Sequence, residues 1–338
     1  MTSLLPTIHC VRERISSYGP LSGNMAKAPI QGLHHVTSMA SDPDETVRFF
    51  RDVLGLRLVK QTVNFDDVTT YHLYFGNETG EPGTALTVFP FGEGRPGTVG
   101  AGQVETTAFH VPAGTLDYWA DRFDDHDVDR DEITDRFGEQ VLGFRDGDGL
   151  RYELVASDEE SVEPWEGSDV PAEHAIRGFH SVTLALVDTT ETAGLLQFMG
   201  YEQTGEEGEY TRFEADGEYA TVVDLHETSD RGQPGLGTVH HVAFRVPDDD
   251  AQFAWQEALS EEGYGVTEQK DRQYFRSIYF RERGGVLFEF ATDGPGFTAD
   301  ESVDELGSSL KLPEWLEGDR ERIEESLPEL TATPVEVR

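Results

Sequence analysis

The chain of 338 residues is poor in cysteine and in lysine, and it has no long hydrophobic run. Its single cysteine, Cys10, excludes an intrachain disulfide framework and a cysteine-based metal site. A chain with so little cysteine suits a reducing cytoplasm, which is where we expect the protein to act. No stretch approaches the ~18 consecutive apolar residues of a transmembrane helix, so the sequence predicts no membrane span.

Positive charge is also scarce. The chain has 66 acidic residues against 26 basic ones, of which only four are lysines, and its formal net charge is −40. Such a surface repels nucleic acid and anionic membranes, and we expect neither as a partner. The acidic residues are spread among apolar residues with normal periodicity, which argues for a folded protein. We interpret the charge as an adaptation to a high-salt cytoplasm, where ions screen the self-repulsion.

What the sequence does contain is an internal repeat. Residues 30–37 (IQGLHHVT) match residues 176–183 (IRGFHSVT) at six of eight positions, counting similar residues. Residues 104–112 (VETTAFHVP) match residues 239–247 (VHHVAFRVP), and residues 149–154 (GLRYEL) match residues 285–290 (GVLFEF). Helix-like stretches follow both members of the first two pairs, at residues 45–54, 116–123, 191–199 and 251–259. Glycines at 55 and 200 supply helix stops.

The repeat divides the chain into four modules of the form βαβββ. Modules 1 and 2 make a first half at residues 28–160, and modules 3 and 4 make a second half at residues 172–295. One such module cannot bury both faces of its sheet, so we expect the modules to pair into curved sheets or barrels around a cavity. Residues 1–27 are interpreted as a disordered extension or a start codon placed too far upstream, and residues 296–338 as a helical tail.

These motifs resemble the vicinal-oxygen-chelate superfamily, which includes glyoxalase I, extradiol dioxygenases and fosfomycin-resistance enzymes. The resemblance runs from about Gly32 to about Leu312 and is greatest to hydroquinone ring-cleaving dioxygenases. It rests on LHHVT at residues 33–37, YHLYF at 71–75, GFHS at 178–181, the pair at 240–241 and GGVLFE at 284–289. It implies an α+β fold of four modules in two similar halves.

The resemblance also implies a metal site, with ligands from the first and last strands of paired modules. His35, His241 and Glu289 match that pattern, and two imidazoles with one carboxylate are the ligand set of non-heme Fe(II) oxygenases. In the repeat, the corresponding positions are Ser181, Thr106 and Glu153, and hydroxyl groups are poor ligands for such metals. The intact set joins module 1 to module 4, so we infer that modules pair 1 with 4 and 2 with 3.

Each predicted ligand histidine follows another histidine. Pleat alternation predicts that His34 and His35 point to opposite faces of their strand, as do His240 and His241. Family alignment selects the second of each pair as the ligand. The alternative is that all four are ordinary polar strand residues with backbone partners. His180 aligns with His34 and is therefore left out of the ligand set.

Other residues near the predicted metal match catalytic positions of the resembling enzymes. Arg272 would neutralise a phenolate or oxyanion, and Tyr279 would donate a hydrogen bond to substrate or dioxygen. His34 and His240 are candidates for acid–base or hydrogen-bonding roles, and Thr37 for lining the site. For each of these an ordinary structural role is the alternative. His72, His174 and His226 are assigned structural roles.

The implied function is a ring-cleaving, extradiol-type dioxygenase. It would use Fe(II), or alternatively Mn(II) or another divalent metal, with a small aromatic diphenol and O₂ as partners. One alternative is a glyoxalase I-type isomerase. Such enzymes generally take a carboxylate from both paired modules, and residues 85–90 (ALTVFP) offer none at the end of module 1. A metal-free protein that binds phenolic compounds is the other alternative. Module edges also favour a homo-oligomer.

Overall fold

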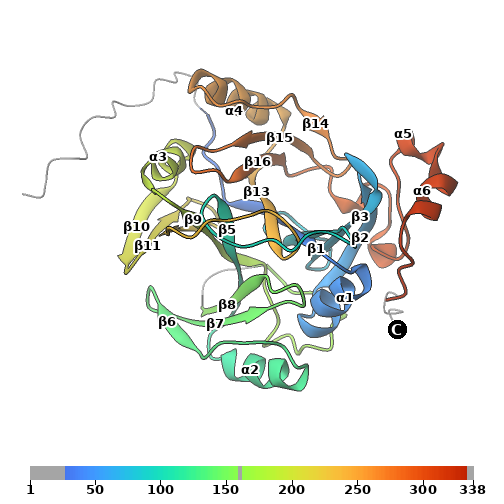
Figure 1. Ribbon diagram of the computed structural model, residues 1–338, viewed down its shortest axis with the longest axis horizontal. Helices are drawn as coiled ribbons and strands as arrows, with labels where there is room; N and C mark the ends of the chain where they lie inside the picture. Colours follow the sequence, from blue (N-terminus) through green and yellow to red (C-terminus); the bar gives the residue numbers. More distant parts are fainter. Residues whose placement is uncertain (1–26, 159–161, 333–338) are drawn as a thin grey trace, which may run out of the picture.

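Two eight-stranded sheets form most of the molecule (Figure 1), which we describe from a computed structural model of residues 27–158 and 162–332. The expected extension at residues 1–27 therefore lies outside the described residues, apart from Lys27. The strands of the first sheet are, in spatial order, β14 (Lys270–Asp271), β15 (Arg276–Arg281), β16 (Leu287–Thr292), β13 (Thr238–Val246), β1 (Leu33–Ala40), β4 (Ala85–Pro90), β3 (Asp67–Gly76) and β2 (Arg57–Asn64).

The second sheet repeats this arrangement. Its strands are, in spatial order, β10 (Glu202–Glu207), β11 (Tyr210–Glu214), β12 (Val222–Glu227), β9 (Phe179–Leu186), β5 (Gln103–Pro112), β8 (Arg151–Ser157), β7 (Glu139–Arg145) and β6 (Thr134–Arg136). Each sheet is curled into a half-barrel. The α+β architecture of four modules is therefore confirmed.

The order of the strands also confirms the predicted pairing of modules. In the first sheet, β1 of module 1 pairs antiparallel with β13 of module 4. In the second sheet, β5 of module 2 pairs antiparallel with β9 of module 3. Each sheet thus joins one module from each half of the sequence. The predicted halves at residues 28–160 and 172–295 are units of the sequence repeat, and neither half corresponds to one sheet.

Helices follow the first strand of each module, as the apolar spacing predicts. They are α1 (Pro43–Val47) with a π-helical continuation at Arg48–Val53, α2 (Leu116–Asp125), α3 (Thr190–Met199) and α4 (Asp249–Glu261). Helix α2 buries Leu116, Trp119 and Phe123, which share one helical face. Helix α4 begins at Asp248, whose side chain accepts a hydrogen bond from the Ala251 amide at 2.9 Å. Helix α3 ends at Gly200, whose φ of 104° suits glycine.

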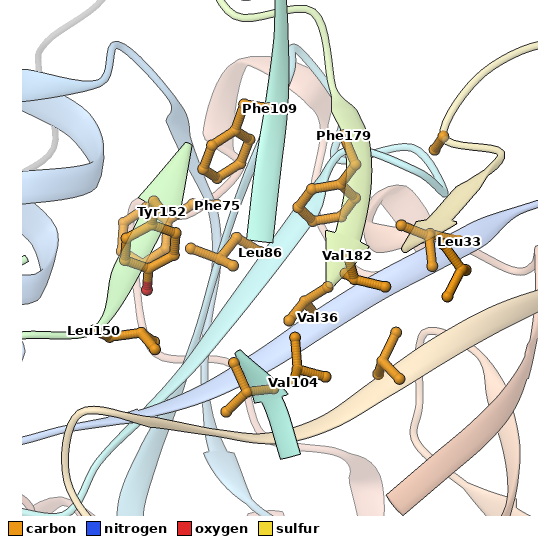
Figure 2. Close-up of a cluster of buried hydrophobic side chains, with 14 of the residues drawn as sticks. Leu33, Val36, Phe75, Leu86, Val104, Phe109, Leu150, Tyr152, Phe179 and Val182 are labelled. Atoms are coloured by element: carbon orange, nitrogen blue, oxygen red, sulfur yellow. The ribbon is translucent and has the colours of Figure 1, made fainter. Parts of the chain in front are cut away.

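Side chains alternate between the two faces of the central strands. One face therefore packs in the core, and the other faces the interior of the first half-barrel. On β1, Val36 is completely buried in the main apolar core, while His35 and Thr37 face the opposite way. Figure 2 shows that the apolar faces of the two sheets meet in this core, with Val36 and Leu86 from the first sheet and Phe109, Val182 and Tyr152 from the second. Polar residues are consequently collected on the concave face of the first sheet.

The tail, which was predicted to be helical, contains only short helical segments. It forms 3₁₀ turns at Phe297–Ala299 and Val303–Glu305, followed by two short helices, α5 (Glu314–Glu317) and α6 (Arg320–Ser326), interrupted at Gly318. These helices lie beside β2 and β3 (Figure 1), where Ile323 and Leu312 pack against Val63. Within the described residues no helix is both long and apolar enough to span a membrane.

Candidate metal centre

Three central strands of the first sheet carry the predicted ligands. His35 lies on β1, His241 on β13 and Glu289 on β16, and the three side chains are buried. The register explains the convergence, because Ala243 is the partner of His35 on one side and of Glu289 on the other. All three side chains therefore project from adjacent strands at one level of the concave face.

The ligand atoms of this triad lie within 4.8 Å of one another. Nε2 of His35 is 3.3 Å from Nε2 of His241, and Oε2 of Glu289 is 3.3 Å and 2.8 Å from these two nitrogens. Among the described residues, Oε2 of Glu289 accepts no directed hydrogen bond, although it is completely buried. Its other oxygen accepts one from the Ser277 hydroxyl. Two imidazole nitrogens and a carboxylate oxygen that converge in this way fit a divalent metal ion.

Burial and neighbouring charges shift the pKa values of two of the three triad residues, Glu289 and His241. Burial would raise the pKa of Glu289, but the neighbouring imidazoles of His35 and His241 outweigh it and hold this pKa well below its usual range. Burial lowers the pKa of His241 despite the adjacent carboxylate. Coordination of a cation requires an ionised carboxylate and neutral imidazoles, and the lowered pKa values of Glu289 and His241 are in the directions that this state needs.

A β-bulge precedes each ligand histidine and changes where its neighbour points. Along β13, His241 pairs with Thr37 and Val239 with Ser38, so that His240 is the extra residue. His34 is the extra residue in the same way on β1. The expectation of strict pleat alternation is therefore wrong at His240, which lines the same cavity as His241.

Both extra histidines contact the far side of a ligand ring. Nδ1 of His34 is 2.9 Å from Nδ1 of His35, and Nδ1 of His240 is 2.7 Å from Nδ1 of His241. If Nε2 of each ligand faces a metal, Nδ1 carries the proton and donates to the preceding histidine. Nε2 of His34 then donates to the Thr292 carbonyl at 3.1 Å. His34 lies outside the cavity, so its position suits orienting His35, whereas His240 is exposed.

A cavity of about 130 Å³ opens beside the triad, compared with the ~10–15 Å³ that one water needs by a similar measure. Its wall is largely aromatic and carries a few polar groups. The lining residues are His35, Asn64, Phe65, Asp66, His72, Tyr74, Phe89, Phe91, His240, His241, Arg272, Phe275 and Tyr279. Such a wall suits an aromatic ligand with hydroxyl substituents.

Arg272 and Tyr279 both reach this cavity and contact each other. Nε of Arg272 donates to the Tyr279 hydroxyl at 3.0 Å, and Nη2 donates to Asp66 at 2.8 Å. Burial and the charge of Glu289 raise the pKa of Tyr279, which keeps its hydroxyl proton available as a donor. Thr37 is completely buried beneath the cavity wall, with Oγ1 2.9 Å from Nε2 of His241.

The equivalent place in the second sheet is occupied by arginines. Ser181 pairs with Ala108, and Ala108 with Glu153, in the register that relates His35, Ala243 and Glu289. There Glu153 accepts hydrogen bonds from Arg136 and Arg151. Guanidinium groups thus neutralise the carboxylate that a metal would meet in the first sheet. The described residues bring His35, His241 and Glu289 together as their only cluster with metal-ligating geometry.

Several residues of the cavity region were not assigned to it from sequence, and three of them, His72, Tyr74 and Thr87, are polar neighbours of the triad. His72 was expected to be structural, yet it lines the cavity, as does Tyr74. Thr87 on β4 pairs with Thr37, and this register position corresponds to that of Glu289 on β16. A hydroxyl therefore stands where a second carboxylate would lie. The absence of a carboxylate at residues 85–90 could have drawn attention to Thr87, whereas no sequence pattern pointed to His72.

The fold and this triad agree with the chain's similarity to known proteins. The model of the Glyoxalase/Bleomycin resistance protein/Dioxygenase superfamily matches residues 32–154 and 180–290, and the protein belongs to this superfamily. One curated relative is named "Putative ring-cleaving dioxygenase MhqO", from Bacillus subtilis (strain 168). It is 46% identical over 316 residues, which cover 93% of this chain and 99% of that protein.

Another relative is the chlorohydroquinone/hydroquinone 1,2-dioxygenase of Sphingobium indicum. It is 39% identical over 308 residues, covering 87% of this chain and 95% of that protein. A crystal structure of a Bacillus subtilis protein described as a putative dioxygenase has a TM-score of 0.88 and 45% identity, covering 91% of this chain and 99% of that one. Glyoxalase I from Zea mays, with a TM-score of 0.57 and 16% identity over 78% of this chain and 92% of that one, shares the fold.

Proposed function

We propose that the protein is a ring-cleaving dioxygenase that inserts O₂ into a hydroquinone- or catechol-type substrate. The observation that carries the proposal is the buried His35–His241–Glu289 triad, which faces an aromatic-lined cavity with polar groups. The names of the relatives, which include a hydroquinone dioxygenase at 39% identity, support the same reaction class. The ring would be opened next to a hydroxyl-bearing carbon, as in extradiol cleavage.

His35, His241 and Glu289 would hold the metal, for which we propose Fe(II), with Mn(II) or another divalent ion as the alternative. A bound Fe(II) would leave coordination positions open for the diphenol and O₂ and would pass electrons between them. The remaining chemistry belongs to the chain. Phe89 and Phe275 line the cavity and limit the access of water to the ring.

The polar side chains of the cavity have separate proposed roles. Arg272 supplies positive charge beside a phenolate oxygen, and Tyr279 donates a hydrogen bond to it. Nδ1 of His240 accepts a hydrogen bond from Nδ1 of His241. Nε2 of His240 is then available to exchange a proton with a hydroxyl of the diphenol. His34, outside the cavity, orients His35.

Isomerase chemistry of the glyoxalase I type is disfavoured by one particular residue. Thr87 occupies the register position on β4 where the paired module would contribute a carboxylate. A threonine hydroxyl is too weak a base to remove a proton from carbon. A metal-free phenol-binding protein would in turn have no use for two imidazoles that converge on a buried carboxylate oxygen to which no described residue donates a directed hydrogen bond.

The deciding experiment is anaerobic reconstitution of the full chain with Fe(II), followed by oxygen uptake across hydroquinones, catechols and methylglyoxal–thiol adducts. Oxygen uptake with a diphenol supports the proposal. Turnover restricted to the thiol adducts would establish an isomerase. Diphenol binding without metal content would establish a metal-free binding protein.

We also propose that the enzyme works in a high-salt cytoplasm and forms a homo-oligomer. The net charge of −40 supports the first part, because salt relieves repulsion among the carboxylates. A midpoint of thermal unfolding that rises with KCl concentration is expected for the first part, and a light-scattering mass that is a multiple of 37.6 kDa for the second.

A further inference from the structure

Four side chains beside the triad form a continuous chain of hydrogen bonds. The hydroxyl oxygen of Tyr74 is 2.7 Å from Nδ1 of His72, and Nε2 of His72 is 2.9 Å from Oγ1 of Thr87. Oγ1 of Thr87 is 2.7 Å from Oγ1 of Thr37, which is itself 2.9 Å from Nε2 of His241. The chain thus runs from a buried phenol to a ligand atom of the triad.

The surroundings of Tyr74 fix the direction of this chain. Its ring is buried among Tyr274, Phe275 and Phe297, at centroid distances of 6.3, 6.4 and 4.9 Å. Among the described residues the only hydrogen-bond partner of its hydroxyl is His72. A buried hydroxyl proton without an acceptor is energetically unfavourable. Tyr74 therefore donates to Nδ1 of His72.

The remaining orientations follow from this first bond. Burial lowers the pKa of His72 well below its usual range, so the ring is neutral and carries one proton. Because Nδ1 accepts, that proton is on Nε2 and is donated to Oγ1 of Thr87. Thr87 in turn donates to Oγ1 of Thr37. The hydroxyl proton of Thr37 then has only the His241 side of the triad toward which to point.

A coordinated Nε2 of His241 has no lone pair left for this proton. We propose that Tyr74, His72 and Thr87 are positioning residues that fix the Thr37 hydroxyl, which adjoins the triad and not the open cavity, as a hydrogen-bond donor to a phenolic oxygen held at the triad. This inference rests on the proposed function for the identity of the acceptor. The direction of the hydrogen bonds from Tyr74 to Thr37 follows from contacts within the protein and does not depend on the proposed function.

Comparison with the second sheet indicates that the chain of hydrogen bonds accompanies the intact triad. There Asp224 takes the position of Thr87, and Arg212 takes that of Tyr74. Nε of Arg212 donates to Asp224 at 2.9 Å, so that an ion pair replaces the chain of neutral donors. The chain from Tyr74 to Thr37 thus occurs in the sheet that retains the histidine ligands.

The first test reads the His72 tautomer by ¹⁵N NMR in the full metal-free chain labelled at histidine, with the resonances assigned through His72→Gln. We expect Nε2 to be protonated and Nδ1 to be an acceptor in the wild type. In Tyr74→Phe, where the donor is lost, this single tautomer should give way to a mixture. A proton on Nδ1 in the wild type would overturn the inference.

The second test measures oxygen uptake after Fe(II) reconstitution. Tyr74→Phe and Thr87→Val should each lower kcat by about tenfold, as expected for one lost hydrogen bond, with little change in KM for the diphenol. The double variant should be no slower than either single variant, because both interrupt one chain. Additive losses, or a change in KM alone, would overturn the inference.

Matched controls are available, because Tyr201 and Thr107 are buried and their hydroxyls have no partner among the described residues. Tyr201→Phe and Thr107→Val should retain the wild-type kcat. Equal losses in these controls would mean that the effect is a general one of core hydroxyls and would refute the positioning role. If the wild type took up no oxygen with any diphenol, the proposed function would fail, while the NMR measurement would still decide the direction of the chain.

Discussion

The Nε2 atoms of His35 and His241 lie 3.3 Å apart although 206 positions separate the two residues along the chain. Module 1 pairing with module 4 produces this proximity, since β1 and β13 are antiparallel neighbours at the centre of one sheet. Two imidazole nitrogens that converge with a buried carboxylate oxygen gain stability from a shared cation. The two modules are therefore joined by backbone hydrogen bonds and, when metal is bound, by coordination.

Removing the carboxylate of the triad should abolish metal binding. We expect Glu289→Gln to bind less than a tenth of the Fe(II) that the wild type binds, and to show no oxygen uptake with a diphenol. Atomic absorption on the reconstituted and desalted chain measures the metal content. The matched control is Glu153→Gln, in the equivalent position of the second sheet, which should retain one metal per chain.

Glu153→Gln should instead reduce stability. Glu153 is buried and accepts hydrogen bonds from Arg136 and Arg151, so the substitution leaves Arg136 with an uncharged partner, while Arg151 keeps its ion pair with Asp131. Loss of one partner from a buried ion pair typically reduces the free energy of unfolding by ~3–5 kcal/mol. Urea unfolding followed by tryptophan fluorescence tests this, and unchanged stability would contradict the ion-pair interpretation of the second sheet.

Tyr279→Phe should lower kcat by ~10²-fold, because donors aimed at a developing oxyanion have effects of this size. Its hydroxyl has a raised pKa from burial and accepts a hydrogen bond from Arg272, so its proton is free to be donated into the cavity. Steady-state oxygen uptake with hydroquinone is the measurement, and metal content should stay at the wild-type level. A variant with full activity would remove Tyr279 from the proposed mechanism.

The ion pairs of Glu139 predict a pH dependence of stability in acid. Burial would raise the pKa of Glu139, but His180 and Arg212, at 3.1 and 2.6 Å, outweigh it and lower this pKa to about 2. Because the folded pKa lies below the 4.5 of a glutamate in the unfolded chain, the contribution to stability is complete above pH 4.5 and is lost as pH falls toward 2.

Glu139→Gln should accordingly flatten the dependence of the unfolding free energy on pH between about 2 and 4.5. Urea titrations at several pH values in this window provide the comparison. The exposed Glu166→Gln serves as a control and should keep the wild-type slope. A slope that is equally steep in Glu139→Gln and the wild type would assign the acid sensitivity to other groups.

Lys60 should be the most important cation for attachment of the tail. It is completely buried, and its Nζ donates to Asp300 at 2.6 Å and also to Glu301. We expect Lys60→Met to destabilise the protein by ~3–5 kcal/mol and to make the segment around residue 300 more sensitive to protease. Lys270→Met, which removes an exposed contact with Asp66, should change stability by less than ~1 kcal/mol. Equal effects of the two substitutions would contradict this account.

Much of the fold follows from the sequence because it is a repeat. Comparing residues 30–37 with residues 176–183 separates the histidine-bearing copy from the serine-bearing one, and the mixed ligand set then requires modules to pair across the two halves. The glycines that end helices, and the absence of a carboxylate at residues 85–90, can also be read directly from the sequence.

Features that depend on register between distant strands could not be predicted. The bulge at His240 exists because Val239 and His241 pair with adjacent residues of β1, and no local pattern encodes that shift. The chain from Tyr74 to Thr37 is built of residue types that are ordinary in strands. The sequence predicts a helical tail, but not its division into two short helices on either side of Gly318.

The most direct test of the dioxygenase assignment is incorporation of ¹⁸O₂ by the Fe(II)-reconstituted chain during turnover of hydroquinone, analysed by mass spectrometry. The account predicts a ring-opened product that contains both oxygen atoms of one O₂ molecule, and no such product from Glu289→Gln. A product that retains its ring, such as the quinone, or a ring-opened product without ¹⁸O, would contradict it.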